Sequence, residues 1–165
     1  MYNRQDKCRI DLVQNAIGDD PVGRSSRELL DPAVAEILDQ ALGMSMNEYY
    51  EKVFARYAFR EKVRKFFENY DLLLTPTLPV PAFKAGQNIP AELHDRNIVS
   101  WVYYTYPFNL TGNPAASVPC GFTKDNLPVG LQIVGATNRE TDIFKAAAAF
   151  EEAQPWADRK PPLME

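Results

Sequence analysis

The uneven placement of proline constrains the fold of this chain more than any other feature of its sequence. Only Pro21 and Pro32 precede residue 76, and the other eleven of the thirteen prolines lie at or beyond Pro76. Proline lacks a backbone N–H and breaks a helix when it lies in the interior. The sequence therefore predicts a helical region over residues 3–70, a mixture of strands, loops and helices over 71–154, and a surface tail at 155–165.

Two helices are predicted in the second half of the helical region. Asp31 and Pro32 are favourable at a helix start and Gly43 at a helix end, which predicts a helix over 32–42. Ser45 and Glu48 match a capping box, which begins a longer helix to about residue 69. Apolar residues in that second helix recur at steps of three and four, so one broad face is expected to pack inward.

The second half of the chain predicts strands and two further helices. The apolar run 71–75 ends at Pro76, which is typical of a strand buried on both faces in a parallel or mixed sheet. Residues 115–122 and 128–134 predict a hairpin around the turn-forming segment 123–127. A helix is expected over 97–110, and another after a capping box at 137–140. That last helix is expected to bury Ile143, Phe144, Ala147 and Phe150. The predicted fold class is α/β, with helices packed on a small mixed β-sheet.

Charge and composition exclude several classes of protein. The net charge of −4 argues against a nucleic-acid binder. No apolar run approaches the roughly 20 residues of a membrane helix, and no apolar segment follows the first residues as in a secretory signal. We therefore expect a cytoplasmic chain that contacts neither nucleic acid nor membrane. The single His94 and the cysteines Cys8 and Cys120 lack metal-ligand spacing, so no metal is expected.

Residues capable of nucleophilic catalysis are few. Ser25 and Ser26 precede a helix, where a capping role is the commoner one. Cys120 lies among apolar neighbours in a predicted strand, a setting typical of an inert thiol. His94 lies in a polar loop, and the chain has neither a G-x-S-x-G elbow nor a phosphate-binding loop. A hydrolase using Cys120 or Ser26 with His94 stays an alternative, but the residues alone identify no active site.

Three collinear segments resemble the amidase signature family. They are residues 70–79 (YDLLLTPTLP), 106–121 (YPFNLTGNPAASVPCG) and 127–135 (LPVGLQIVG). Pro155 and Trp156 are similar to the common ending of the family. The similarity runs from about residue 30 to residue 162 and corresponds to the C-terminal third of a family member.

The resemblance implies an amide hydrolase whose catalytic residues lie elsewhere. Members of the family hydrolyse or transfer carboxylic amides through a Ser–cis-Ser–Lys triad, with backbone N–H groups as the oxyanion hole and no cofactor. Those residues belong to a Gly/Ser-rich stretch, which has no match here; residues 22–27 (VGRSSR) lack its pattern. The triad therefore carries over to no residue, and the chain alone is expected to be inactive.

The resemblance also implies which residues border the acyl side of the substrate cleft. Residues of the matching strand end and helix are Thr75, Thr77, Trp101, Tyr104, Thr105 and Phe108. The four helical members share one face at i, i+3, i+4 and i+7, but a core stripe has the same spacing, so both interpretations stay open. In the glutamyl-tRNA amidotransferase branch of the family, the matching helix typically carries an amine-binding Asp where this chain has Val102. Val102 favours a broad amidase with a less polar pocket.

Two further hypotheses follow for a chain without the triad. The chain could be a non-catalytic binding or structural module, or one half of a split amidase that needs a separate N-terminal partner. In the intact enzyme the substrate would be a small-molecule amide. Without the missing part, the chain is expected to expose apolar surface and to self-associate.

Overall fold

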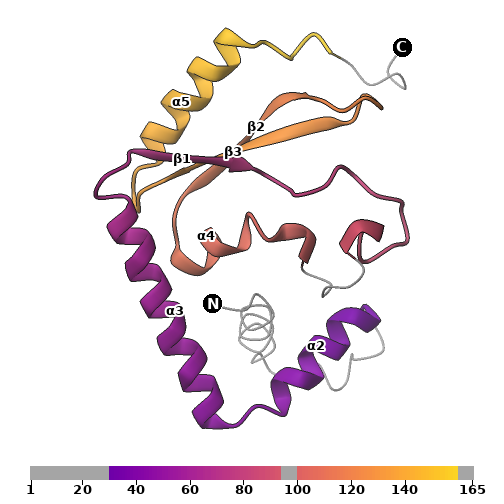
Figure 1. Ribbon diagram of the computed structural model, residues 1–165, viewed down its shortest axis with the longest axis vertical. Helices are drawn as coiled ribbons and strands as arrows, with labels where there is room; N and C mark the ends of the chain where they lie inside the picture. The colour runs from indigo at the N-terminus through magenta and orange to yellow at the C-terminus, as the bar shows by residue number, and fades with distance from the viewer. Residues whose placement is uncertain (1–29, 94–99, 160–165) are drawn as a thin grey trace.

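The computed structural model describes residues 30–93 and 100–159 (Figure 1). Its elements in chain order are α2 (Pro32–Leu42), α3 (Met46–Phe66), β1 (Leu72–Pro76), the short 3₁₀ helices η2 (Ala91–Leu93) and η3 (Ser100–Val102), α4 (Tyr106–Thr111), β2 (Ala115–Phe122), β3 (Pro128–Gly135) and α5 (Glu140–Ala153). Residues 3–29 of the predicted helical region, with Cys8, Ser25 and Ser26, lie outside the described residues, and so does His94. No helix within the described ranges is both long and apolar enough to cross a membrane.

Both predicted N-terminal helices are present. Helix α2 has the predicted bounds and buries Ile37 and Leu38. Helix α3 begins at the predicted capping box, where the Ser45 N–H donates to the Glu48 carboxylate over 2.8 Å and the Glu48 N–H donates to Ser45 Oγ over 3.3 Å. The hydrogen bonds that the Glu48 carboxylate accepts from Ser45 lower the pKa of Glu48.

The predicted inward-packing face of α3 is wrong for the described part of the chain. Helix α3 ends at Phe66, three residues early, and contains no buried side chain. Its exposed large apolar residues are Met46, Tyr50, Phe54 and Tyr57. The contact to α4 covers only one side of α3, and Arg56 strengthens it by donating from Nε to the Leu110 carbonyl over 2.9 Å.

The three strands form one antiparallel sheet with the order β1-β3-β2. The predicted hairpin is confirmed, since β2 and β3 pair directly around the turn. The predicted parallel or mixed sheet is wrong for the described strands, because β1 pairs antiparallel with β3 and lies at an edge. As a consequence Leu74 is 57% exposed, although burial on both faces was expected.

The sheet has helices on both faces. Leu72, Val118 and Ile133 share one face, which packs against Ile143 and Phe150 of α5 to form the core. The other face is turned toward α4, so that α5 lies above the sheet and α4 below it in Figure 1. Helices on a small sheet confirm the predicted α/β class.

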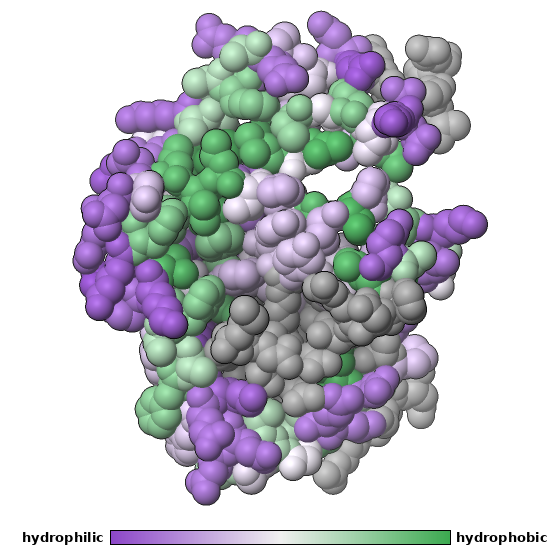
Figure 2. All heavy atoms as spheres, viewed as in Figure 1, coloured by the Kyte–Doolittle hydropathy of each residue, from purple (hydrophilic) through white to green (hydrophobic). Residues whose placement is uncertain are grey.

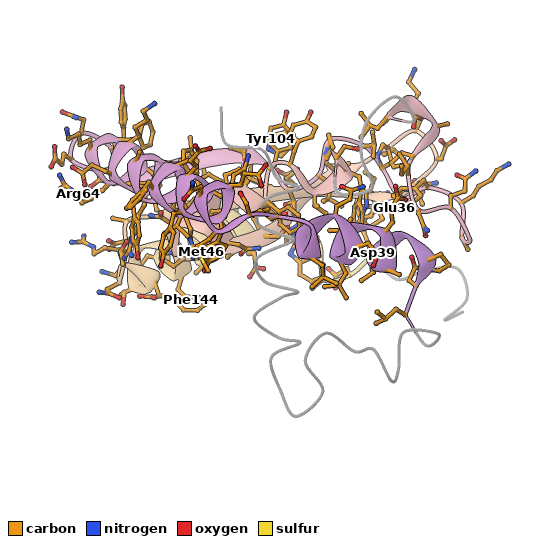
Figure 3. All side chains as sticks on the ribbon, turned by 90° about the horizontal axis from the view of Figure 1, so that it is seen from below. Glu36, Asp39, Met46, Arg64, Tyr104 and Phe144 are labelled. Carbon is orange, nitrogen blue, oxygen red and sulfur yellow. The ribbon has the colours of Figure 1, made fainter. Side chains whose placement is uncertain are left out.

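Helix α5 departs from the prediction at its start and on one face. Asn138 adopts a left-handed φ of 62°, and α5 begins only after Arg139, so the capping box predicted at 137–140 does not form. Ile143 is buried as predicted, but Phe144 is 68% exposed. One residue turns a helix by about 100°, which takes Phe144 off the face that covers the sheet. Figure 3 shows Phe144 and Tyr104 on opposite sides of the molecule.

The helix predicted over 97–110 is broken. Its described part comprises η3, a turn and α4, which begins at Tyr106. Pro107 lies in the first turn of α4, where its missing N–H costs nothing, but it cannot continue a helix from upstream. Gly112 ends α4 as expected, with a left-handed φ of 76° and its N–H donating to the Phe108 carbonyl over 2.8 Å.

Candidate functional site

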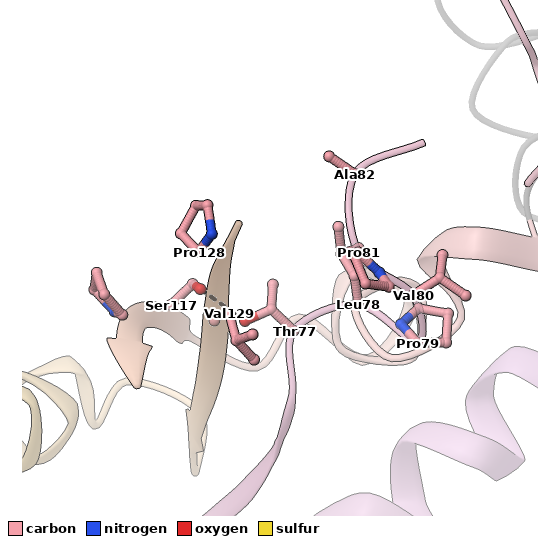
Figure 4. Close-up of a pocket in the computed structure, with 11 residues that line it drawn as sticks. Thr77, Leu78, Pro79, Val80, Pro81, Ala82, Ser117, Pro128 and Val129 are labelled. Atoms are coloured by element: carbon pink, nitrogen blue, oxygen red, sulfur yellow. Dashed lines mark hydrogen bonds between the residues drawn. The ribbon is translucent and has the colours of Figure 1, made fainter. Parts of the chain in front are cut away.

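An open cleft separates the loop that follows β1 from the β2–β3 hairpin. Its volume is about 510 Å³. Residues 77–82 form one wall, and Ser117, Pro119, Pro128, Val129 and Gly130 form the other (Figure 4). The space-filling view shows the molecule hollowed at this place (Figure 2). The walls are mainly apolar, and no ionisable side chain belongs to them.

Two hydroxyl groups meet at the base of the cleft. Thr77 Oγ1 and Ser117 Oγ lie 2.7 Å apart and share a hydrogen bond, drawn as a dashed line in Figure 4. The Thr77 N–H donates to the Gly130 carbonyl over 2.9 Å, which fixes the first residue of the loop against β3. A Cβ at Gly130 would lie 2.7 Å from both hydroxyl oxygens. The absence of a side chain at Gly130 therefore leaves room for the pair.

Gln132 connects two of the predicted site residues from beneath the cleft. Its side chain is buried, with 3% of the residue exposed. Nε2 donates to Thr75 Oγ1 over 2.8 Å and to the Tyr104 carbonyl over 3.0 Å. Gln132 thereby joins the end of β1 to the turn before α4. This residue was not among the predicted site residues; the signal that could have found it was a lone polar side chain within the apolar stretch of 127–135.

The remaining predicted residues do not share one helical face, because η3 and α4 are separate. Trp101 packs edge-on against Phe83, with ring centroids 5.6 Å apart. Thr105 Oγ1 donates to the Val102 carbonyl over 3.0 Å, and Phe108 is buried. None of Trp101, Tyr104, Thr105 and Phe108 lines the 510 Å³ cleft. Their part in a substrate pocket stays a prediction.

The phenol of Tyr104 interacts with its neighbour in sequence. Its ring lies 4.5 Å from that of Tyr103, measured between centroids. A hydrogen bond with the Tyr103 side chain, and the charge that Tyr103 would carry on ionisation, raise the pKa of Tyr104, so the phenol stays protonated at neutral pH. Tyr104 thus contributes its backbone carbonyl, and not an ionised side chain, to the contact with Gln132.

Cys120 lies away from the cleft base. Its Sγ donates to the Val129 carbonyl over 3.4 Å. Together with Trp156 and Arg159 it lines a second cavity of about 430 Å³. In the described part of the chain no three His, Cys, Asp or Glu side chains come together as metal ligands. The 510 Å³ cleft can thus hold an uncharged group against its apolar walls and two hydroxyls, but its lining offers no acid–base pair.

Substitution of Gln132 by leucine is expected to lower the free energy of unfolding by about 1–3 kcal/mol, because the buried partners of Nε2 lose their hydrogen bonds. Urea unfolding followed by circular dichroism measures the change. Gln87→Leu serves as the control, since Gln87 is exposed, and should stay within about 0.5 kcal/mol of the parent chain. Equal effects of the two substitutions would remove the structural role given to Gln132.

Comparison with known proteins gives consistent matches. The sequence profile of the family described as Amidase matches residues 4–144. An acylamidase from Rhodococcus erythropolis is 42% identical over 100 residues, which cover 58% of this chain and 21% of that protein. The A-type subunit of glutamyl-tRNA(Gln) amidotransferase from Bacillus mycoides (strain KBAB4) is 41% identical over 118 residues, covering 70% of this chain and 23% of that protein.

Solved structures match the fold over nearly the whole chain. A 6-aminohexanoate cyclic dimer hydrolase complexed with substrate aligns with a TM-score of 0.76 and 26% identity, covering 98% of this chain and 35% of its own. A bacterial aryl acylamidase aligns with a TM-score of 0.74 and 25% identity, covering 94% and 35%. The chain thus spans less than a quarter of these two curated relatives and about a third of these structures.

Proposed function

The chain belongs to the amidase signature family, as its three motifs predicted, and on that premise we propose that it forms the C-terminal part of an amide hydrolase. The enzyme would cleave a carboxylic amide to an acid and ammonia or an amine. The part of the enzyme outside this chain would supply the Ser–cis-Ser–Lys triad and the oxyanion hole. The described residues would supply the wall of the acyl side.

The observation that carries this proposal is the chemistry of the 510 Å³ cleft. It begins at Thr77, one of the residues that the family resemblance assigns to the acyl side. An uncharged acyl or aryl group would bury apolar surface against Leu78, Val80 and Val129 without leaving a charge unpaired. The Thr77–Ser117 hydroxyl pair could hydrogen-bond one polar atom of such a group. An ionised substrate would find no counter-charge in this lining.

The substrate class follows from the same lining and from Val102. Val102 lies in η3 and is half-buried. Its isopropyl group cannot bind an amine, in contrast to the Asp typical of glutamine-using family members. We therefore infer a small, uncharged, largely apolar amide as substrate, cleaved without a metal or an organic cofactor.

The test is reconstitution of amide hydrolysis. The chain is co-purified with a separately expressed piece of the Rhodococcus erythropolis acylamidase, namely the part that this chain does not match. Release of ammonia or amine is then measured on a panel of aliphatic and aryl amides. We expect turnover from the combination and none from either piece alone.

Two outcomes would contradict the proposal. Turnover by the chain alone that is lost in Cys120→Ala or Ser26→Ala would place a nucleophile in this chain and support the alternative with His94. A stable combination without any turnover would leave the chain as a non-catalytic module. Gln87→Leu in the combination controls for the handling of a variant, since Gln87 lies away from the cleft lining.

A further inference from the structure

Strand β1 has one edge without a strand partner among the described residues. It pairs with β3, and the order β1-β3-β2 places it outermost. The Thr77 N–H donates to the Gly130 carbonyl, which sets the alternation of the antiparallel ladder. Backbone groups of Leu73 and Thr75 then point toward β3, while those of Leu72 and Leu74 point to the outer edge.

This outer edge lacks the features that protect natural sheet edges. Edge strands of stable domains usually carry charges, prolines or bulges that prevent pairing with another strand. The two residues whose backbone groups point outward are both leucines, and Pro76 interrupts the edge only at the end of the strand. The Leu74 side chain is 57% exposed, whereas its register partner Ile133 is 1% exposed. Such an edge is a template for a further strand.

We propose that a β-strand from the amidase part outside this chain pairs with the outer edge of β1. This inference rests on the proposed function. The occupant is argued from chain length: the fold described here covers 98% of this chain but 35% of the 6-aminohexanoate cyclic dimer hydrolase, so most of that fold lies outside it. A second copy pairing through its own β1 would cover Leu74 but would bring no catalytic residue.

The position of this edge gives the docking a chemical consequence. Thr77 follows Pro76 directly and begins the wall of the 510 Å³ cleft. A strand paired along β1 must therefore end beside that cleft, because Pro76 offers no N–H for continued pairing. Residues at the end of the added strand are delivered next to the Thr77–Ser117 hydroxyl pair. The edge would thus fix the catalytic part relative to the acyl side.

The experiment follows backbone hydrogen exchange by NMR in the chain, alone and with the unmatched part of the Rhodococcus erythropolis acylamidase. In the free chain we expect fast exchange at Leu72 and Leu74 and slow exchange at Leu73 and Thr75. Addition of the acylamidase part should slow exchange at Leu72 and Leu74 at least about 100-fold. Leu74→Pro should weaken binding at least about tenfold, since it removes an outward N–H while leaving the bonds to β3 intact.

Leu74→Ala and Phe144→Ser are the matched variants. Leu74→Ala keeps the outward N–H, so it should bind more tightly than Leu74→Pro. Phe144→Ser removes exposed apolar surface on α5, on the side of the molecule opposite Tyr104, and should bind like the parent chain. A circular dichroism spectrum of each variant, matching the parent, shows that the fold is kept.

Each other outcome overturns the inference or the proposed function separately. Absence of binding, binding that Leu74→Pro leaves unchanged, or protection elsewhere overturns the β1 edge as the docking surface. Protection of Leu72 and Leu74 in the chain alone that rises with concentration makes a second copy the occupant. Protection by the acylamidase part without amide hydrolysis keeps the docking surface and overturns the proposed function. Hydrolysis without protection at β1 does the reverse.

Discussion

Ile133→Ala is expected to lower the free energy of unfolding by about 3–4 kcal/mol, a large fraction of the stability of a typical domain. Ile133 is 1% exposed and lies on the middle strand of the sheet, between β1 and β2. Its side chain packs with Val118 and Ile143 in the core cluster. Removal of its terminal carbons leaves a cavity that neither the sheet nor α5 can fill by a small movement. Urea unfolding measures the loss.

Leu74→Ala is the control for this substitution because Leu74 and Ile133 are register partners on the same sheet face. Leu74 is 57% exposed, so its truncation should cost less than about 1 kcal/mol in the isolated chain. If the two variants lost similar stability, the assignment of the core to the face covered by α5 would be wrong.

Gly130→Ala is expected to weaken the binding of acetanilide to the cleft about tenfold, which corresponds to about 1.4 kcal/mol. The new Cβ would lie 2.7 Å from Thr77 Oγ1 and Ser117 Oγ and 3.1 Å from Thr77 Cβ. The two hydroxyls must rotate or the loop must retreat, and either movement alters the base of the cleft. An NMR titration that follows the Thr77 methyl group measures the dissociation constant.

Gly135→Ala separates this effect from a general loss of packing. A Cβ at Gly135 would lie 3.1 Å from Ile143 Cδ1 and Cγ1, on the α5 side of the sheet. We expect a lower unfolding temperature with an unchanged affinity for acetanilide. Unchanged affinity in Gly130→Ala, with the chemical shift of Thr77 undisturbed, would mean that the ligand binds elsewhere.

Elements determined by local interactions could be predicted from the sequence. Helix α2 has its predicted bounds because Asp31, Pro32 and Gly43 act within one turn of its ends. The hairpin is predictable for the same reason, since Thr123 closes its turn through contacts with Asp125 and Leu127. Such signals depend on residues a few positions apart, and the rest of the fold alters them little.

Features determined by the neighbours of an element could not be predicted in the same way. The apolar run of β1 indicates burial but contains no information on which strands flank it, so the exposure of Leu74 was missed. The pattern at 137–140 fits a capping box equally well, but Asn138 tolerates a left-handed conformation and delays the start of α5. Tertiary placement decided each case.

The candidate site shows the same division. Thr77 was predicted from a motif and lies in the cleft, but its partner Ser117 is 40 positions away in sequence. Gln132 and Thr75 are 57 positions apart, and only the register of β1 on β3 brings them into contact. Pairing of this kind depends on the assembled sheet, which a single sequence does not specify.

The strand order β1-β3-β2 affects how the sheet forms during synthesis on the ribosome. The middle strand β3 is the last of the three to be synthesised, and β1 is the first. Roughly 60 residues separate the end of β1 from the end of β3, so at a synthesis rate of about 5–20 residues per second β1 waits about 3–12 s for its partner. During that interval the leucines of the nascent β1 are a target for chaperones that bind exposed apolar segments.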